Sequence, residues 1–217
     1  GCDYTKKELA ELLSGSKPLS KIINTHYHED HVGGNALLGE RFGLRAIAHP
    51  DTIRLMGGKY DLYPYQREIW GYPEPCPADA IETWLNEEGA RFRVIESPGH
   101  CKGHISLFEE NRGILFSGDI WVGEHPKTAR TEENVPQIIA DLRKFEELRP
   151  KIMFASLGKI VPEPAEVIKR TRTYLEETRD MILELHSEGK SSEQIRDELF
   201  GRESVLAEVT QYQLSTK

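Results

Sequence analysis

Four side chains that can bind a metal ion lie within six residues near the start of the chain. In an extended segment, residues two apart project to the same side, so the imidazoles of His26 and His28 can face one point, which the following turn can also reach. A single histidine in a loop more often serves packing, but four such groups at this spacing favour a metal site. Neutral imidazole and carboxylate suit zinc or iron, and an ion with an open position lowers the pKa of bound water to about 7. The candidate ligands of this cluster are His26, His28, Asp30 and His31.

Two more candidate ligands follow turns farther along the chain. Gly99 lets the backbone turn tightly after a predicted strand and directs His100 outward. Asp119 follows Ser117-Gly118 at the end of another predicted strand, although a carboxylate in such a place is more often a turn or helix-cap residue. Each motif alone is a weak signal. Together with the histidine cluster they share one geometry, in which every candidate ligand lies where a strand stops.

The elements that must position these side chains alternate between helices and strands, as in layered α/β folds. Thr5-Lys6-Lys7-Glu8 fits a capping box at the start of a first helix, and Pro136 is placed as the first residue of a later one. From Pro164 onward an apolar stripe predicts helices, the second of which opens on the capping box Ser191-Ser192-Glu193-Gln194. The predicted strands cover residues 21–24, 45–48, 92–95, 105–108, 113–117 and 152–155.

Residues 57–77 change in character, because prolines, glycines and aromatic side chains follow one another with little periodicity. This composition predicts a loop. Loops over the edge of a scaffold commonly supply specificity, so the aromatic side chains could form a lid that lines a substrate cleft. Ordinary packing explains them equally well. The candidate substrate-binding residues are Tyr63, Tyr65, Trp70 and Tyr72.

Charge and hydropathy exclude several classes of function. The net charge is −8 and the sequence pI about 5.6, so no broad cationic surface is available for phosphates, and we expect no nucleic-acid partner. No run approaches the ~20 apolar residues that a membrane-spanning helix needs, so we expect no membrane partner. Cys2, Cys76 and Cys101 lack the paired spacing of a disulfide framework or a zinc knuckle, so a cytoplasmic location is the simplest expectation. The chain opens without an initiator Met, and this expectation therefore allows for a trimmed N-terminus.

Taken in order, the segment from Thr25 to His31, then Gly99-His100, then Ser117-Gly118-Asp119 resemble the signature of the metallo-β-lactamase superfamily. The resemblance covers about residues 20–165. It implies a four-layer αββα sandwich, in which two mixed sheets have helices outside and a metal site along one edge. It also implies ligand roles: His26, His28 and His100 would hold a first metal, Asp30 and His31 would help to hold a second, and Asp119 would bridge the two.

Two features depart from the superfamily pattern. Relatives usually carry a further histidine in a turn after the last core strand, and the matching place here reads Ser156-Leu157-Gly158, where leucine cannot bind a metal. Relatives also place two or more strands before the histidine motif, so N-terminal strands are expected to be missing here. The last part of the chain resembles the helical C-terminal extensions of other members. We therefore divide the chain into a core domain, residues 1–163, and a helical extension, residues 164–217.

The resemblance implies a metal-dependent hydrolase of a small ester, thioester or lactone, similar to glyoxalase II-type thioesterases and lactonases. A metal-bound hydroxide would attack the carbonyl, and Asp30 would orient it or accept its proton. The expected cofactor is zinc, as one or two ions, with iron or manganese as alternatives. The expected partner is a small-molecule substrate, with a homodimer left open.

Two other functions are open. An iron-dependent persulfide dioxygenase would hold one Fe(II) through His26, His100 and Asp119. A degenerate relative would bind metal without turnover, which Leu157 and the absent leading strands motivate. Cys101 directly follows His100 and should therefore point elsewhere. The histidines that we expect to be structural or solvent-exposed are His49, His104, His125 and His186.

Overall fold

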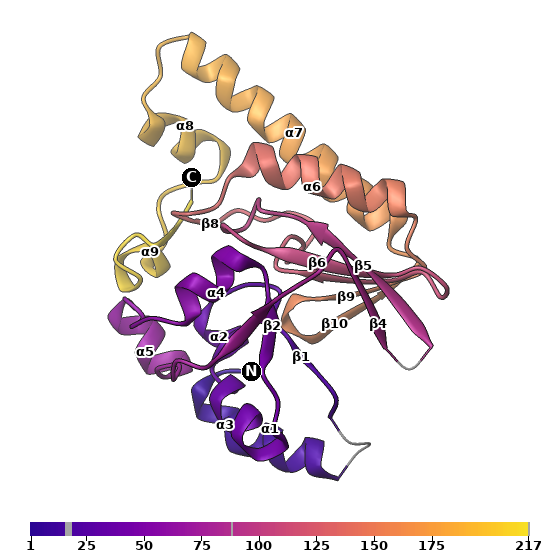
Figure 1. The fold of residues 1–217 in the computed structure, drawn as a ribbon. Helices are drawn as coiled ribbons and strands as arrows, with labels where there is room; N and C mark the ends of the chain where they lie inside the picture. The colour runs from indigo at the N-terminus through magenta and orange to yellow at the C-terminus, as the bar shows by residue number, and fades with distance from the viewer. Residues whose placement is uncertain (16–18, 88, 217) are drawn as a thin grey trace.

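Two sheets of unequal size lie face to face at the centre of the computed structural model, which describes residues 1–15, 19–87 and 89–216 (Figure 1). The larger sheet has the strand order β10-β9-β7-β6-β5-β4, the smaller one β1-β2-β3, and β11 pairs with β8. The strands are β1 (Ile22–Ile23), β2 (Ala46–Ala48), β3 (Ala78–Ala80), β4 (Trp84–Glu87), β5 (Ala90–Glu96), β6 (Ile105–Glu109), β7 (Ile114–Gly118), β8 (Ala129–Arg130), β9 (Ile152–Ala155), β10 (Lys159–Pro162) and β11 (Leu214–Ser215).

Helices cover the outer face of each sheet (Figure 1). Those of the first third of the chain lie against the smaller sheet, whereas α6 and α7 pack on each other over the larger one. The helices are α1 (Lys6–Ser14), α2 (Glu29–Val32), α3 (Asn35–Phe42), α4 (Pro50–Met56), α5 (Pro64–Trp70), α6 (Val135–Leu148), α7 (Ala165–Ser187), α8 (Ser192–Leu199) and α9 (Val205–Val209), with short 3-10 turns η1 (Asp3–Thr5) and η2 (Ser156–Gly158).

The two sheets differ in strand direction. In the larger sheet β7 and β9 run parallel while the other neighbours run antiparallel, so this sheet is mixed as expected. In the smaller sheet, by contrast, the described strands β1, β2 and β3 are all parallel. The expectation of two mixed sheets is therefore wrong for this part of the chain. The helices α2 to α5 supply the crossover connections that parallel strands need.

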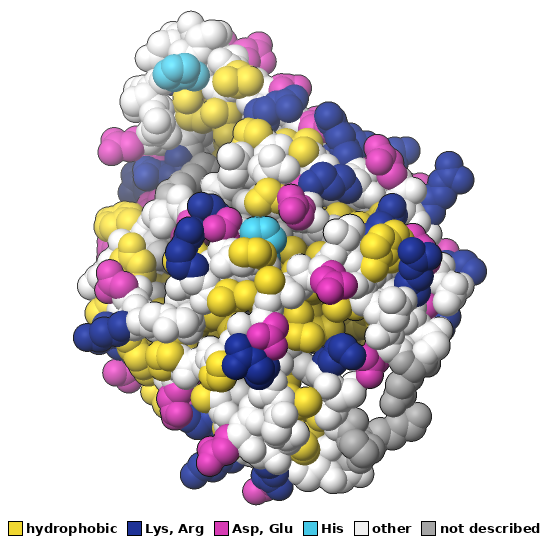
Figure 2. Space-filling view, in the orientation of Figure 1, with side chains coloured by type: hydrophobic (Ala, Val, Ile, Leu, Met, Phe, Trp, Pro, Cys, Tyr) yellow, Lys and Arg dark blue, Asp and Glu magenta, His cyan; other side chains and the backbone are white. Residues whose placement is uncertain are grey.

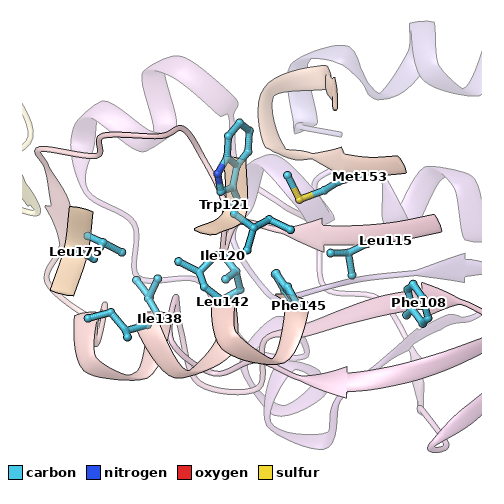
Figure 3. Close-up of a cluster of buried hydrophobic side chains, with 11 residues drawn as sticks. Phe108, Leu115, Ile120, Trp121, Ile138, Leu142, Phe145, Met153 and Leu175 are labelled. Atoms are coloured by element: carbon cyan, nitrogen blue, oxygen red, sulfur yellow. The ribbon is translucent and has the colours of Figure 1, made fainter. Parts of the chain in front are cut away.

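Three apolar clusters hold the layers together. Leu115 and Met153 of the larger sheet pack against Leu142 and Phe145 of α6, and none of these four side chains is exposed (Figure 3). A second cluster joins the smaller sheet to α1 and α3. The third lies between the sheets, where Ile23 of β1 packs on residues of the larger sheet. Because close-packed side chains cover both faces of the sheets, the loops at the strand ends are held in place.

Helix starts follow the sequence signals in two of three cases. The Asn134 side chain accepts a hydrogen bond from the Gln137 backbone at the start of α6, just before Pro136, and the capping box at Ser191 forms at α8. The predicted capping box at Thr5 does not form. The 3-10 turn η1 precedes α1, and the Thr5 hydroxyl lies 3.3 Å from Cys2 Sγ and does not cap the helix.

Two further predictions need correction. The segment 57–77 is not simply a loop, because Pro64–Trp70 form α5, at whose start the Gln66 side chain accepts a hydrogen bond from the Tyr63 backbone N–H at 2.8 Å. The C-terminal extension is not all helical either. Its Leu214–Ser215 strand, β11, pairs antiparallel with β8, so the end of the described chain returns to the core (Figure 1).

The surface carries both signs of charge. On the face shown in Figure 2, Lys and Arg side chains alternate with Asp and Glu, and apolar side chains are visible in a depression between them. None of the described helices combines the length and the apolar character that crossing a bilayer requires.

Candidate metal centre

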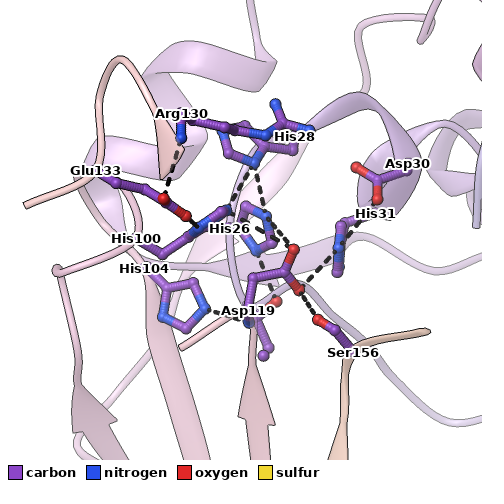
Figure 4. A network of polar contacts seen from close by, with 12 residues as sticks. His26, His28, Asp30, His31, His100, His104, Asp119, Arg130, Glu133 and Ser156 are labelled. Atoms are coloured by element: carbon purple, nitrogen blue, oxygen red, sulfur yellow. Dashed lines mark hydrogen bonds and ion pairs between the residues drawn. The ribbon is translucent and has the colours of Figure 1, made fainter. Parts of the chain in front are cut away.

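The predicted ligands converge at one edge of the two sheets (Figure 4). His26 and His28 lie in the loop after β1, His100 in the turn after β5, and Asp119 directly after β7. The strand register of β7 on β9 shifts between Phe116 and Gly118, a local irregularity of the kind that redirects a side chain at the end of a strand. The geometry inferred from the sequence, with each ligand where a strand stops, is therefore present.

Three histidines form the first cluster. The Nε2 atoms of His26 and His100 both lie 3.0 Å from Nδ1 of His28. All three side chains are buried. Burial lowers the pKa of His26 well below its usual value and that of His28 to about 4, so these rings are neutral and offer lone pairs. Three convergent ring nitrogens fit a divalent metal such as zinc.

Two glutamates that the sequence did not indicate lie behind these rings. Nδ1 of His100 lies 2.7 Å from Glu133 Oε1, and Nε2 of His28 lies 3.1 Å from Glu132 Oε1. Carboxylates on the far side of ligand imidazoles fix the ring tautomer and raise the basicity of the ligand. Glu133 is 33 residues from His100 in sequence, so no spacing signal could have linked them.

The second cluster contains Asp30, His31 and Asp119. Nε2 of His31 lies 3.3 Å from Asp119 Oδ1 and 3.4 Å from Asp30 Oδ2. Burial alone would lower the pKa of His31, but these carboxylates outweigh it and raise that pKa to about 9. The other oxygen of Asp30 is buried and has no hydrogen-bond partner among the described residues. An acidic site with an orphaned buried oxygen fits a cation.

Asp119 lies between the two clusters. Its Oδ2 is 3.7 Å from Nε2 of His100 and 4.0 Å from Nε2 of His26, while its Oδ1 faces His31. Burial would raise the pKa of Asp119, but the hydrogen bond and charge of His31 hold it well below the usual value. The carboxylate is therefore ionised and placed to serve both metal positions.

The turn that would supply a further ligand contains no metal-binding side chain. Leu157 is 82% exposed and adopts left-handed backbone angles, φ 58° and ψ 29°. Its neighbour Ser156 points into the site instead, and its hydroxyl donates to Asp119 Oδ1 at 2.7 Å (Figure 4). The second position therefore has fewer protein ligands than the superfamily pattern provides.

His104 is buried and positions Asp119. The Asp119 backbone N–H donates to Nε2 of His104 at 3.1 Å, and Nδ1 of the same ring lies 2.9 Å from Ser97 Oγ. Burial lowers the pKa of His104 far enough to keep the ring neutral, so its proton is on Nδ1 and points to Ser97. Gly118, at φ +53°, leaves room for the ring, since a Cβ there would lie 2.3 Å from Nε2. The sequence offered no sign of this contact beyond the spacing of two histidines in one turn.

Cys101 lies where the sequence analysis did not expect it. Its side chain is 1% exposed, and its Sγ lies within 4.8 Å of a ring nitrogen of His26, His28 and His100. The expectation that it points elsewhere assumed a strand, where neighbouring side chains alternate. The chain instead turns at this place, because the His104 N–H donates to the Cys101 carbonyl at 3.1 Å. In such a turn two successive side chains can face the same point.

The four candidate substrate-binding aromatics lie in different surroundings. Tyr63 lines a cavity of about 370 Å³ that His28 and Glu132 also line. Tyr65 is buried, and its hydroxyl makes a hydrogen bond with Gln213. The Tyr72 hydroxyl donates to the Tyr60 carbonyl at 2.8 Å, and Trp70 lies beside the Arg130 guanidinium. Tyr63 alone of these four therefore faces the cavity next to the metal centre, while Tyr27 and Tyr60 also line it.

A buried polar network joins α5 to the metal centre. Glu29 is 1% exposed and accepts a hydrogen bond from Gln66 Nε2 at 2.8 Å, while Nη2 of Arg130 lies 3.8 Å away. Burial raises the pKa of Glu29, and the Arg130 charge opposes that rise. Glu29 lies between two ligands in sequence, so its burial ties the histidine segment to α5.

Comparison with known proteins shows the family and the fold of the chain. A family profile described as the metallo-beta-lactamase superfamily matches residues 1–156, and the chain belongs to this superfamily. The predicted αββα fold is therefore confirmed. The solved structure of TTHA1623, in a di-iron-bound form, is 26% identical with a TM-score of 0.59, over 76% of this chain and 83% of that one.

Curated relatives include a beta-lactamase-like protein 2 homolog of Drosophila melanogaster, 27% identical over 81% of this chain. Another is the hydroxyacylglutathione hydrolase GloC of Haemophilus influenzae, 28% identical over 47% of this chain. The chain spans 58% of the length of the first and 50% of the second.

Proposed function

We propose that this chain hydrolyses a small ester, thioester or lactone with one or two divalent metal ions, zinc being the first candidate. The observation that supports this most is the convergence of the His26, His28 and His100 nitrogens beside the shared carboxylate of Asp119. A divalent ion held there acidifies water and polarises a carbonyl oxygen. The names of several relatives, hydroxyacylglutathione hydrolases, favour the thioester among the three substrates.

Different residues would have different roles in this reaction. Asp119 and Asp30 are ionised at neutral pH and can orient water and accept its proton, because burial is outweighed in both by the charge of His31. Tyr63 and the residues around it line the cavity that opens beside His28, where the rest of a substrate can bind. Lys59 and Asp61 place opposite charges on the lining of the same cavity, which suits a polar substrate.

The test combines metal content with turnover. We expect protein purified without added metal to contain zinc and to hydrolyse members of a thioester and lactone panel, and we expect His28→Ala to lose most bound metal and activity. His186→Ala, on the exposed part of α7, is the matched control and should change neither. An undiminished rate in His28→Ala would contradict the proposal, and metal without turnover would favour the degenerate alternative.

One observation favours a second candidate, the iron-dependent persulfide dioxygenase. Two histidines and one carboxylate is the ligand set of non-haem Fe(II) oxygenases, and Asp119 Oδ2 lies within 4.0 Å of the ring nitrogens of His26 and His100. This candidate predicts iron as the bound metal and oxygen consumption with a persulfide. Zinc content with no oxygen consumption would reject it.

A further inference from the structure

The first histidine cluster contains a sulfur atom that the proposed function does not use. Cys101 Sγ lies within 4.8 Å of a ring nitrogen of each of the three histidines, and all four side chains are buried. Among residues 1–15, 19–87 and 89–216 the thiol makes no hydrogen bond. The thiol is buried beside the ring nitrogens of all three histidines, and no other partner for it lies among the described residues.

The surroundings of the thiol favour a cation. Carboxylates of Glu132, Asp119 and Glu133 lie around it, and the Arg130 guanidinium is the opposing charge. A thiol that coordinates a divalent ion is deprotonated outright, so Cys101 would bind as a thiolate. The net negative charge around Cys101 would repel a free thiolate. The same charge attracts a divalent cation, which a thiolate can bind.

The turn holds the thiol in this direction. The backbone bond from His104 to the Cys101 carbonyl closes it, and the Thr52 hydroxyl of α4 donates to the Gly103 carbonyl at 2.9 Å. Gly103 has φ +77°, and a Cβ there would lie 2.9 Å from the Thr52 backbone. The fold thus fixes the turn from both sides, and Cys101 does not depend on a flexible loop for its position.

We propose that the Cys101 thiolate is a fourth protein ligand of the metal held by His26, His28 and His100. On binding, a metal–sulfur bond forms, and the thiol proton leaves to solvent. The inference rests on the metal centre of the proposed function but not on its reaction. Imidazole and thiolate are both ligands that suit zinc, and zinc can expand to five ligands, which leaves a position for water beside the thiolate.

Cobalt provides the first test, because a thiolate bound to Co²⁺ gives a charge-transfer absorption that imidazole and carboxylate do not. We expect the band to appear with the first equivalent of Co²⁺ in the wild-type protein and to disappear in Cys101→Ser, which still binds that equivalent through its three histidines. The double variant Cys2→Ser/Cys76→Ser is the control and should keep the band, since both cysteines lie outside the cluster.

X-ray absorption of the zinc-loaded wild-type protein provides a second test that needs no variant. We expect one sulfur at about 2.3 Å beside nitrogens at about 2.0–2.1 Å. Zinc bound with nitrogen and oxygen alone, or cobalt bound without the band, would overturn the thiolate ligand and leave the proposed metal centre intact. If the wild-type protein binds neither ion, the metal centre itself is wrong, and both proposals fall.

Discussion

The two proposed metal positions differ in how fully protein side chains surround them. The first has three buried imidazoles, and the carboxylates of Glu132 and Glu133 lie behind two of them. The second has Asp30, His31 and the shared Asp119, and the turn that could complete it presents Leu157 to solvent instead. A shared sequence signature therefore indicates the candidate ligands, but it does not determine the affinity of each position for its ion.

The largest effect should come from the residue that both positions share. We expect Asp119→Ala to lower kcat/KM about a thousandfold or more, because it removes a group placed for proton transfer, and to reduce the metal bound at both positions. The measurement is steady-state kinetics with metal analysis. Asp79→Ala, whose carboxylate is exposed on β3, should behave as wild type. Unchanged metal content in Asp119→Ala would show that the two positions are independent.

The carboxylate behind His100 tests the first position by itself. We expect Glu133→Ala to weaken the first metal about 10- to 100-fold, since partners that orient a ligand imidazole have effects of this size. Titration with a competing chelator measures it. Glu147→Ala, on the exposed face of α6, is the control. If the second metal weakens more than the first, the assignment of Glu133 to the first position is wrong.

Leu157→His should bring the metal affinity of the second position closer to that of the first. Histidine tolerates the left-handed backbone of this residue better than leucine does. Because Leu157 faces solvent and Ser156 points into the site, the new ring supplies the absent ligand only once the turn rotates toward Asp119. Because even orienting partners change metal affinity about 10- to 100-fold, we expect the second zinc to bind at least about tenfold more tightly, with the first unchanged. Leu157→Asn separates the backbone effect from the ligand effect. Equal metal binding by both variants would contradict the ligand role.

The smallest expected effect concerns the support of Asp119. His104→Leu leaves the Asp119 backbone N–H buried without an acceptor, which should lower the free energy of unfolding by about 1–3 kcal/mol. Urea unfolding of the metal-free protein measures this. His104→Gln, whose side-chain oxygen can accept the same bond, should recover part of the loss. No difference between the two variants would show that packing, and not the hydrogen bond, is what His104 contributes.

Much of the metal centre was visible in the sequence because its ligands lie in short motifs at strand ends. The segment from His26 to His31 brings its groups together through local geometry, and the strand and hairpin patterns place His100 and Asp119 at the same edge. The apolar periodicity likewise located α6 and α7. The helix α5 was missed because its aromatic and proline content masks the helical period, while the hydrogen bond from the Tyr63 backbone to the Gln66 side chain became evident only in the structure.

By itself the sequence indicated the family, the candidate ligand types and six of the strands, because these depend on residue identity and on contacts close along the chain. Only the tertiary structure decided that Glu133 supports His100, that His104 holds Asp119, and that Cys101 faces the histidines. These contacts depend on how turns from separate strands meet, and on a backbone turn that breaks strand alternation. The spacing of residues in the sequence indicates neither the meeting of these turns nor the break in strand alternation, because the packing of the sheets and helices determines both.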